Sequence, residues 1–126
     1  TPVHSGYNRI LVYKVGGKAK LPPMRPPAAI PQQPKPNATK EEVAKGGVLY
    51  NQYCANCHGS GAISGGMIPD LRHLRHEAHQ AFNSIVLNGT LARYGMAPFG
   101  DVLKRDDVQA IHAYILQRAW DTMDQK

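Results

Sequence analysis

The 126-residue sequence predicts an all-α domain of three main helices, preceded by an extended, proline-rich arm. Apolar residues recur at helical spacing in two stretches after residue 39, a capping box predicts a helix before them, and no stretch there has the pattern of a strong strand. Seven of the ten prolines lie in residues 22–36, where they fix φ and restrict the residue before them. We therefore expect three zones, namely residues 1–17, 18–38 and 39–126.

The first two zones are expected to be extended. Residues 7–15 (YNRILVYKV) are rich in β-branched and aromatic side chains and end at two glycines, which predicts a strand. A lone strand is unstable, so it must pair with the rest of the chain or with a larger sheet. Residues 18–38 are expected to be a linker that spaces or straps two bodies, or else a disordered tail.

The third zone begins with a capping box formed by Thr39 and Glu42. The helix that follows is expected to run to about Cys57, and its adjacent Gly46 and Gly47 predict a close backbone contact, because glycine otherwise destabilises a helix. A second helix is expected to stop at Asn88-Gly89, and a last helix to begin near Arg105. The apolar positions at helical spacing are Ala78, Ala81, Phe82, Ile85 and Val86 in the second helix, and Val108, Ile111, Ile115 and Ala119 in the last.

The net charge of +6 is unevenly distributed. Residues 1–40 contain seven basic residues and no acid, whereas residues 41–126 contain eight basic residues and nine acids. We interpret the basic arm as a solvated tail and expect no nucleic-acid binding, with a dock for an acidic neighbour as the alternative. No stretch is long and apolar enough to cross a bilayer. No signal peptide is recognisable at Thr1, so we expect a processed or excised chain.

A C-x-x-C-H motif, the pattern of covalent haem attachment, is formed by Cys54, Cys57 and His58. On a helix these residues lie at i, i+3 and i+4 and share one face. The thiols would form thioethers with the haem vinyl groups, while the imidazole would ligate the iron. The motif therefore predicts a chain that transfers electrons.

Other uses of the two cysteines fit less well. A zinc site would need more ligands, and His73, His76 and His79 follow the cysteines too closely for the usual finger spacing. A thioredoxin-like dithiol would require a strand before the motif. A disulfide would be strained across a two-residue gap within a helix.

Met96 is the predicted sixth ligand of the iron. It lies in a loop bounded by glycine and proline between the second and last helices, where it can cover the haem face opposite His58. Its thioether would favour the reduced iron. Met67, nine residues after His58, is the competing candidate, and a packing role for Met96 is the other alternative. Ligation by a second histidine is a further alternative; the candidates are His73, His76, His79 and His112.

Further residues are expected to support the haem. The carbonyl of Pro69 is expected to accept a hydrogen bond from Nδ1 of His58 and so fix the ring. The propionates are expected to be held by some of the following, because Arg binds carboxylates bidentately: Arg72, Arg75, Arg93 and Tyr94. The alternative for each arginine is a solvated surface position.

Taken in this order, these residues resemble a class I cytochrome c over about residues 40–121. The resemblance implies the class I cytochrome c fold, with three main helices around one covalently bound haem c. It also implies that the first helix packs against the last. The matching positions are Gly46, Tyr50, the haem motif, Pro69-Asp70-Leu71, Met96, Ile111 and Tyr114.

A narrower resemblance covers the whole chain. Residues 8–17 (NRILVYKVGG) resemble the closing strand of the β-propeller in pyrroloquinoline-quinone (PQQ) dehydrogenases. In quinohaemoprotein alcohol dehydrogenases a proline-rich connector and a cytochrome c domain follow, and residues 66–72 and 85–89 resemble parts of that domain. The resemblance implies a strand remnant of the propeller at 1–17, a linker at 18–38 and a cytochrome c domain at 39–126.

The same resemblance implies the partners. PQQ, Ca²⁺ and the catalytic acid would belong to a propeller domain outside this chain, so the chain alone is not expected to oxidise alcohols. It would relay electrons singly from reduced PQQ to an external acceptor, either a small copper protein, another cytochrome or a quinone-linked system. A periplasmic location is implied. Two alternatives stay open: a free-standing carrier cytochrome, and a haem peroxidase or gas-binding protein with an open sixth site.

Overall fold

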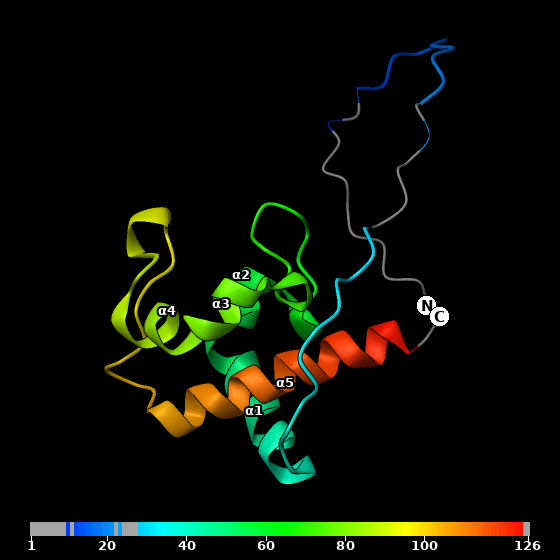
Figure 1. The fold of residues 1–126 in the computed structure, drawn as a ribbon. Helices are drawn as coiled ribbons and strands as arrows, with labels where there is room; N and C mark the ends of the chain where they lie inside the picture. The colour runs from blue at the N-terminus through cyan, green and yellow to red at the C-terminus, as the bar shows by residue number, and fades with distance from the viewer. Residues whose placement is uncertain (1–9, 11, 22, 24–27, 125–126) are drawn as a thin grey trace.

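The computed structural model describes residues 10, 12–21, 23 and 28–124 (Figure 1). Within these residues the chain is helical and contains no strand, which confirms the predicted all-α class. The α-helices are α1 (Lys40–Tyr53), α2 (Ala55–His58), α3 (His76–Gln80), α4 (Phe82–Asn88) and α5 (Arg105–Met123). Short 3₁₀ helices occur at η1 (Ser60–Ala62), η2 (Leu71–His73) and η3 (Ala92–Tyr94).

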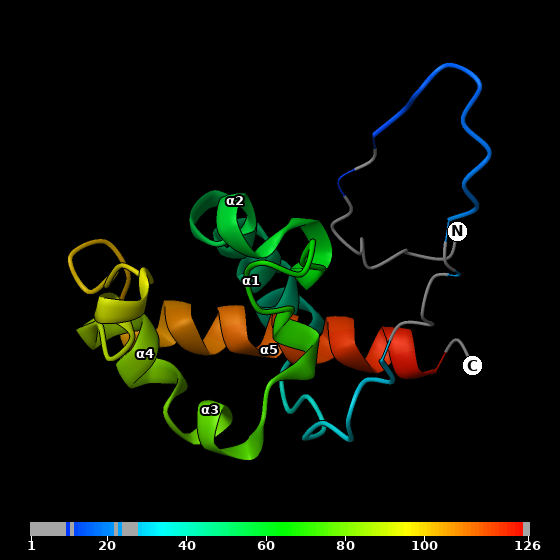
Figure 2. The same ribbon diagram turned by 90° about the horizontal axis from the view of Figure 1, so that it is seen from above.

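Helices α1 and α5 cross, and their contact forms the centre of the fold (Figure 2). A Cβ atom built on Gly46 would lie only 1.9 Å from the carbonyl oxygen of Ala110, so glycine is required where the two backbones meet. Tyr50 is fully buried beside this crossing, with its ring centroid 5.2 Å from that of Tyr114. The close backbone contact that the paired glycines predict is therefore confirmed.

The core continues from this crossing toward α4. One apolar stripe of α5 is buried as predicted, and it packs with side chains from α1, α4 and the loop before α5. The cluster consists of Tyr50, Ala62, Phe82, Val86, Leu103, Val108, Ile111 and Ile115. Burial of these side chains is the main driving force that holds the helices together.

Three of the predicted helix ends are confirmed, namely the start of the first helix, the end of the second and the start of the last. The backbone N–H of Glu42 donates to Thr39 Oγ1 at 3.1 Å, and the Glu42 carboxylate accepts from the N–H of Thr39 at 2.7 Å. Gly89 ends α4 with φ of 73°, a left-handed conformation that glycine adopts without strain. Asp107 in the first turn of α5 accepts from the backbone N–H of Lys104 at 3.0 Å.

Two of the predicted helices are each divided in two. The first was expected to run without interruption to about Cys57, but α1 ends at Tyr53 and Cys54 turns the chain into α2. The second breaks at Ala81, whose φ of −89° and ψ of 3° separate α3 from α4. α3 buries no side chain, whereas α4 buries Phe82 and Val86, so the break lets α4 turn its apolar side to the core.

The linker zone divides into an arm and a docked segment. Residues 28–38, called the strap below, pass across α5 on their way to α1 (Figure 1). Gln33 of the strap is only 3% exposed, and the indole Nε1 of Trp120 on α5 donates to the carbonyl oxygen of Pro34 at 2.8 Å. This part of the linker therefore belongs to the folded body and is not a free tail.

The strand expected at residues 7–15 is not formed where the structure describes it. Residues 10 and 12–15 are neither paired nor helical, and Ile10 and Val15 are almost fully exposed. Residues 7–9 and 11, like 22 and 24–27 of the predicted linker, lie outside the described residues. A strand needs a neighbour to complete its hydrogen bonds, and the described chain offers no sheet. Its origin in a propeller stays a prediction.

Among the described residues, no helix combines the length and the apolar character needed to span a bilayer.

Candidate haem-binding site

The haem motif lies on α2 and at the residue that joins it to α1. Cys54 is half-buried and packs against the hydrophobic core, whereas Cys57 is exposed, and both have free thiols. Burial, together with the nearby Cys57, raises the pKa of the Cys54 thiol to about 11. Because neither thiol is in a disulfide, both are available for thioether bonds.

His58 is buried, and its ring is fixed by the backbone. Its Nδ1 lies 2.9 Å from the carbonyl oxygen of Pro69. A carbonyl oxygen can only accept, so Nδ1 carries the proton and Nε2 keeps the lone pair that a metal ligand needs. The arrangement that sequence analysis expects for Pro69 is therefore present, while the role of His58 as an iron ligand stays a prediction.

The loop that carries Pro69 is braced by contacts that the sequence did not indicate. Ser64 is buried, and its hydroxyl donates to the carbonyl oxygen of Ile68 and accepts from the N–H of Gly66 at 3.1 Å. Tyr50 donates its phenolic hydrogen to the carbonyl oxygen of Gly59 at 2.8 Å, immediately after the haem motif. No spacing signal in the sequence identifies Ser64 for this role.

Arg72 has a different position from the one expected of a propionate ligand. Its side chain is buried, and its Nε and Nη2 atoms bind Asp70 in a bidentate pair at 3.0 and 2.7 Å. Its Nη1 donates to Thr122 Oγ1 on α5 at 3.3 Å. The guanidinium thus ties the segment after Pro69 to α5, and we leave Arg72 out of the proposed propionate contacts.

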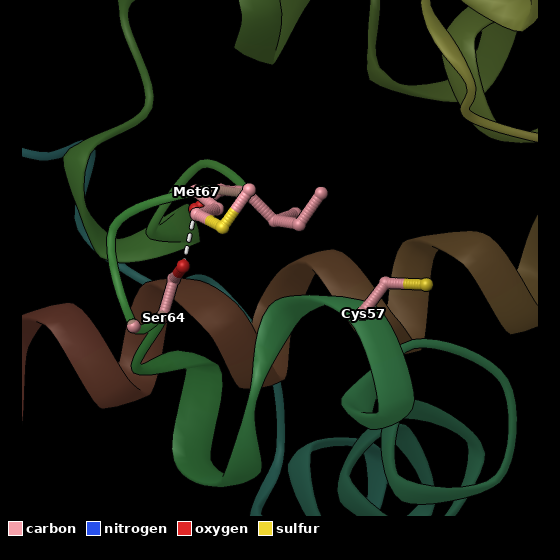
Figure 3. Close-up of a pocket in the computed structure, with 5 residues that line it drawn as sticks. Cys57, Ser64 and Met67 are labelled. Carbon is pink, nitrogen blue, oxygen red and sulfur yellow. Dashed lines mark hydrogen bonds between the residues drawn. The ribbon is translucent and has the colours of Figure 1, made fainter. Parts of the chain in front are cut away.

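Met96 lies in the loop between α4 and α5. It is half-buried and packs against the hydrophobic core, in a loop held by the N–H of Phe99, which donates to the carbonyl oxygen of Val86 at 2.8 Å. Met67 is more exposed than Met96 and lies in a different loop, the one that carries Pro69. It is 87% exposed and lines a shallow pocket of about 240 Å³ on the same side as Cys57 (Figure 3).

The remaining propionate candidates are all on the surface. Arg93 and Tyr94 form one unit in η3, two residues before Met96, with the Arg93 guanidinium carbon 4.6 Å from the centre of the Tyr94 ring. The Arg93 guanidinium also donates to the Tyr94 hydroxyl. Arg75 is exposed at the start of α3. Arg93 and Tyr94 are therefore the candidates nearest the predicted distal ligand in the chain.

Three of the four histidines that could compete for iron or zinc bind other side chains, and the fourth, His73, is half-buried. His79 and His112 bind one another, and His76 pairs with Gln80 on the surface of α3. In the part of the chain that the structure describes, no group of three or more His, Cys, Asp or Glu side chains could hold a metal ion. The zinc alternative therefore finds no ligand set among these residues.

Together the donor atoms fit a haem c site. Two free thiols and a free imidazole nitrogen lie on one short stretch, and a thioether comes from a separate loop. Cys54 and Met96 pack against the same hydrophobic core as several partly buried apolar side chains, among them Leu71, Leu74, Leu87 and Phe99. This combination matches covalent attachment with one nitrogen and one sulfur ligand in an apolar setting.

Comparison with known proteins also identifies relatives that are cytochromes or haem-containing dehydrogenases. The family model described as "Cytochrome C oxidase, cbb3-type, subunit III" matches residues 41–115. The chain is 44% identical over 116 residues to quinohemoprotein alcohol dehydrogenase ADH IIB of Pseudomonas putida, which covers 90% of this chain and 17% of that protein. It is 40% identical over 75 residues to cytochrome c550 of Pseudomonas aeruginosa, covering 56% of this chain and 51% of that protein.

A solved structure is also similar. Quinohemoprotein alcohol dehydrogenase ADHIIG from Pseudomonas putida HK5 matches with a TM-score of 0.66 and 41% identity, over 90% of this chain and 16% of that one. The chain thus spans about one sixth of the length of these alcohol dehydrogenases. The chain therefore belongs to the cbb3-type cytochrome c domain family. Its relatives include the cytochrome c regions of quinohaemoprotein alcohol dehydrogenases.

Proposed function

We propose that this chain is a single-haem electron-transfer domain that relays electrons one at a time from the reduced PQQ of a dehydrogenase domain to an external acceptor. When bound, haem c supplies a one-electron couple between ferric and ferrous iron. The membership of the cytochrome c family supports the electron-transfer part. The similarity to quinohaemoprotein alcohol dehydrogenases supports the choice of electron donor.

The observation that carries the proposal is the arrangement around His58. Cys54 and Cys57 would hold the cofactor covalently, and Pro69 keeps the imidazole in the tautomer that leaves Nε2 free. The hydrogen bond to the Pro69 carbonyl also makes the ring more electron-rich. An imidazole fixed in this way costs little reorganisation when the charge at the iron changes by one, which is what electron transfer requires.

Met96 would supply the second axial ligand. Its loop packs on the core through Phe99 and is therefore held in place before any ligand binds. A thioether ligand would leave no open coordination position, which favours electron transfer over peroxide or gas chemistry. Met67 is a weaker candidate, because it is exposed and comes from the loop on the side of Cys57.

Substitution of the two methionines in the haem-loaded chain tests this assignment. In the wild-type protein, the mass should exceed that of the polypeptide by one haem, and the ferric spectrum should show the weak methionine-to-iron band at its red end. Met96→Ala should abolish that band and allow the reduced protein to bind carbon monoxide rapidly. The matched control, Met67→Ala, should keep the band and remain closed to carbon monoxide.

The opposite pattern, in which Met67→Ala removes the band, would assign the ligand to the other loop. Rapid carbon monoxide binding by the wild-type protein would favour the peroxidase or gas-binding alternative.

The donor and acceptor are tested separately. Residues 18–38 would connect this domain to a PQQ-dependent dehydrogenase domain in the periplasm, where a small copper protein, a cytochrome or a quinone-linked system would accept the electrons. In the full-length enzyme, addition of an alcohol should reduce the haem before any external acceptor is supplied. A haem that stays ferric under these conditions, although the dehydrogenase domain turns over with an artificial acceptor, would contradict the proposed relay from reduced PQQ to this haem.

A further inference from the structure

The strap is held on the domain by a partly buried series of hydrogen bonds, which does not include the predicted iron ligands. Gln33 donates through Nε2 to the carbonyl oxygens of Pro31 at 3.0 Å and Leu74 at 3.2 Å. Its Oε1 lies 2.8 Å from Nε2 of His79, and Nδ1 of His79 lies 2.8 Å from Nε2 of His112. This series of hydrogen bonds therefore connects the strap to α3 and α5.

The direction of each hydrogen bond is fixed when both rings are neutral. Carbonyl oxygens only accept, so the Gln33 amide must turn its Nε2 toward Leu74 and its Oε1 toward His79. His79 must then carry its proton on Nε2, which leaves Nδ1 as an acceptor. His112 completes the series by donating from its own Nε2.

The surroundings favour the neutral rings. The ring of His112 stacks on Phe82, with centroids 4.3 Å apart and planes inclined by 14°. Burial, with a smaller effect of His79, lowers the pKa of His112 to about 4. Burial also lowers the pKa of His79, and His76 acts in the same direction against the opposing effect of the Leu74 carbonyl.

No acidic side chain among the described residues contributes to either pKa shift. α4 has no charged residue, and α5 has none within one turn of His112. The other charged side chains on the segments that pack here are exposed, namely Glu77 on α3 and Lys35 on the strap.

We propose that Gln33, His79 and His112 form an acid-released clasp that holds the strap on the domain. The first proton can be shared, because an imidazolium on either ring still has a neutral partner to accept its N–H. The second proton places an N–H opposite an N–H, so that bond is lost and the two positive charges repel each other. His79 must then turn, and Gln33 loses the donor that anchors it.

The clasp would control how far this domain can lie from a domain that precedes it. With the strap docked, residues 28–38 cannot serve as a linker. Their release would lengthen the reach by about 34 Å, at a rise of about 3.1 Å per residue. The inference concerns the strap alone and does not depend on the proposed electron relay.

The single tryptophan reports on the strap, because its indole N–H donates to Pro34. In the haem-loaded, reduced chain, we expect one indole resonance in nitrogen–proton NMR spectra, at its docked position at neutral pH. As the pH falls toward about 4, where the pKa of His112 lies, this resonance should move to its free position. The haem absorption spectrum should not change over the same range, which shows that the domain stays folded.

Two variants separate release from simple destabilisation. His112→Phe keeps an aromatic ring beside Phe82 but removes the ring that would take up the second proton. A lone imidazolium on His79 still donates to Gln33. His79→Gln offers an uncharged N–H to the same oxygen. Both variants should keep the strap docked at acidic pH, whereas the control His76→Gln, at an exposed position, should release it like the wild type.

Three results would overturn the proposal: a wild-type indole resonance that does not move while the histidines titrate, release in the His112→Phe and His79→Gln variants at the wild-type pH, or loss of release in the His76→Gln control.

Discussion

The crossing of α1 and α5 makes Gly46→Ala the most informative substitution for the fold. A methyl carbon at this position would lie 1.9 Å from the carbonyl oxygen of Ala110 and 2.4 Å from its carbonyl carbon. Non-bonded carbon and oxygen atoms stay about 3.3 Å or more apart, so the helices must separate by more than about 1 Å. Both atoms that the methyl meets belong to the backbone of α5, so no side-chain rotation relieves the clash.

The expected loss of stability is the sum of two destabilising contributions and one stabilising contribution. Overpacking of a closed interface costs about 1–3 kcal/mol, and a gap of about 1 Å forfeits a quarter to a half of the dispersion energy of the contacts around it. Those contacts include the fully buried Tyr50 and the nearly buried Ile111. Alanine returns about 1 kcal/mol of helix propensity. Overpacking less the propensity gain leaves about 0–2 kcal/mol, to which the lost dispersion energy adds, so we expect a net loss of about 2 kcal/mol. This loss lowers Tm by about 8 °C for a domain of this size.

Urea unfolding of the haem-loaded protein, followed by far-ultraviolet circular dichroism, measures this loss. Gly47→Ala is the matched control, because it adds the same methyl one residue away on the same helix. There the nearest atoms, at 3.1 and 3.2 Å, belong to the edge of the Tyr114 ring, which can shift. We expect the control to change stability by less than about 1 kcal/mol. Equal stability of Gly46→Ala and the wild type would refute the close backbone contact.

Two further substitutions test the supports of the haem motif. Tyr50→Phe leaves the partly buried carbonyl oxygen of Gly59 without its donor. We expect the free energy of unfolding in urea to fall by about 1–3 kcal/mol. An unchanged midpoint would show that the hydroxyl contributes nothing to stability. Arg72→Gln leaves the Asp70 carboxylate largely buried without its bidentate partner, and we expect a loss of about 3–5 kcal/mol. A loss below about 1 kcal/mol, as for a surface pair, would contradict that account.

Much of the candidate site can be predicted from local sequence patterns. The C-x-x-C-H motif, the capping box at Thr39 and the glycine that ends α4 each depend on neighbours within a few residues, so spacing alone identifies them. The paired glycines of α1 also indicate a close contact, although only the structure identifies Ala110 as the partner of Gly46.

Interactions between distant parts of the chain were not predictable in this way. The 46 residues that separate Gln33 from His79 in sequence give no periodic signal for their hydrogen bond. Arg72 is a predicted propionate contact because arginine binds carboxylates. In the structure its guanidinium binds a carboxylate of the protein itself, that of Asp70. The break at Ala81 likewise depends on which side chains the core can accept.

The sequence by itself determined the helical class, the capped ends of the helices at Thr39 and Gly89 and the chemistry of the donor atoms, because these depend on short-range spacing and on residue type. Only the tertiary structure decided that residues 28–38 dock on the domain, that Arg72 pairs with Asp70, and that Met96 is packed while Met67 is exposed. The physical reason is that burial and the pairing of distant polar groups are properties of the whole packed chain, which no local pattern contains.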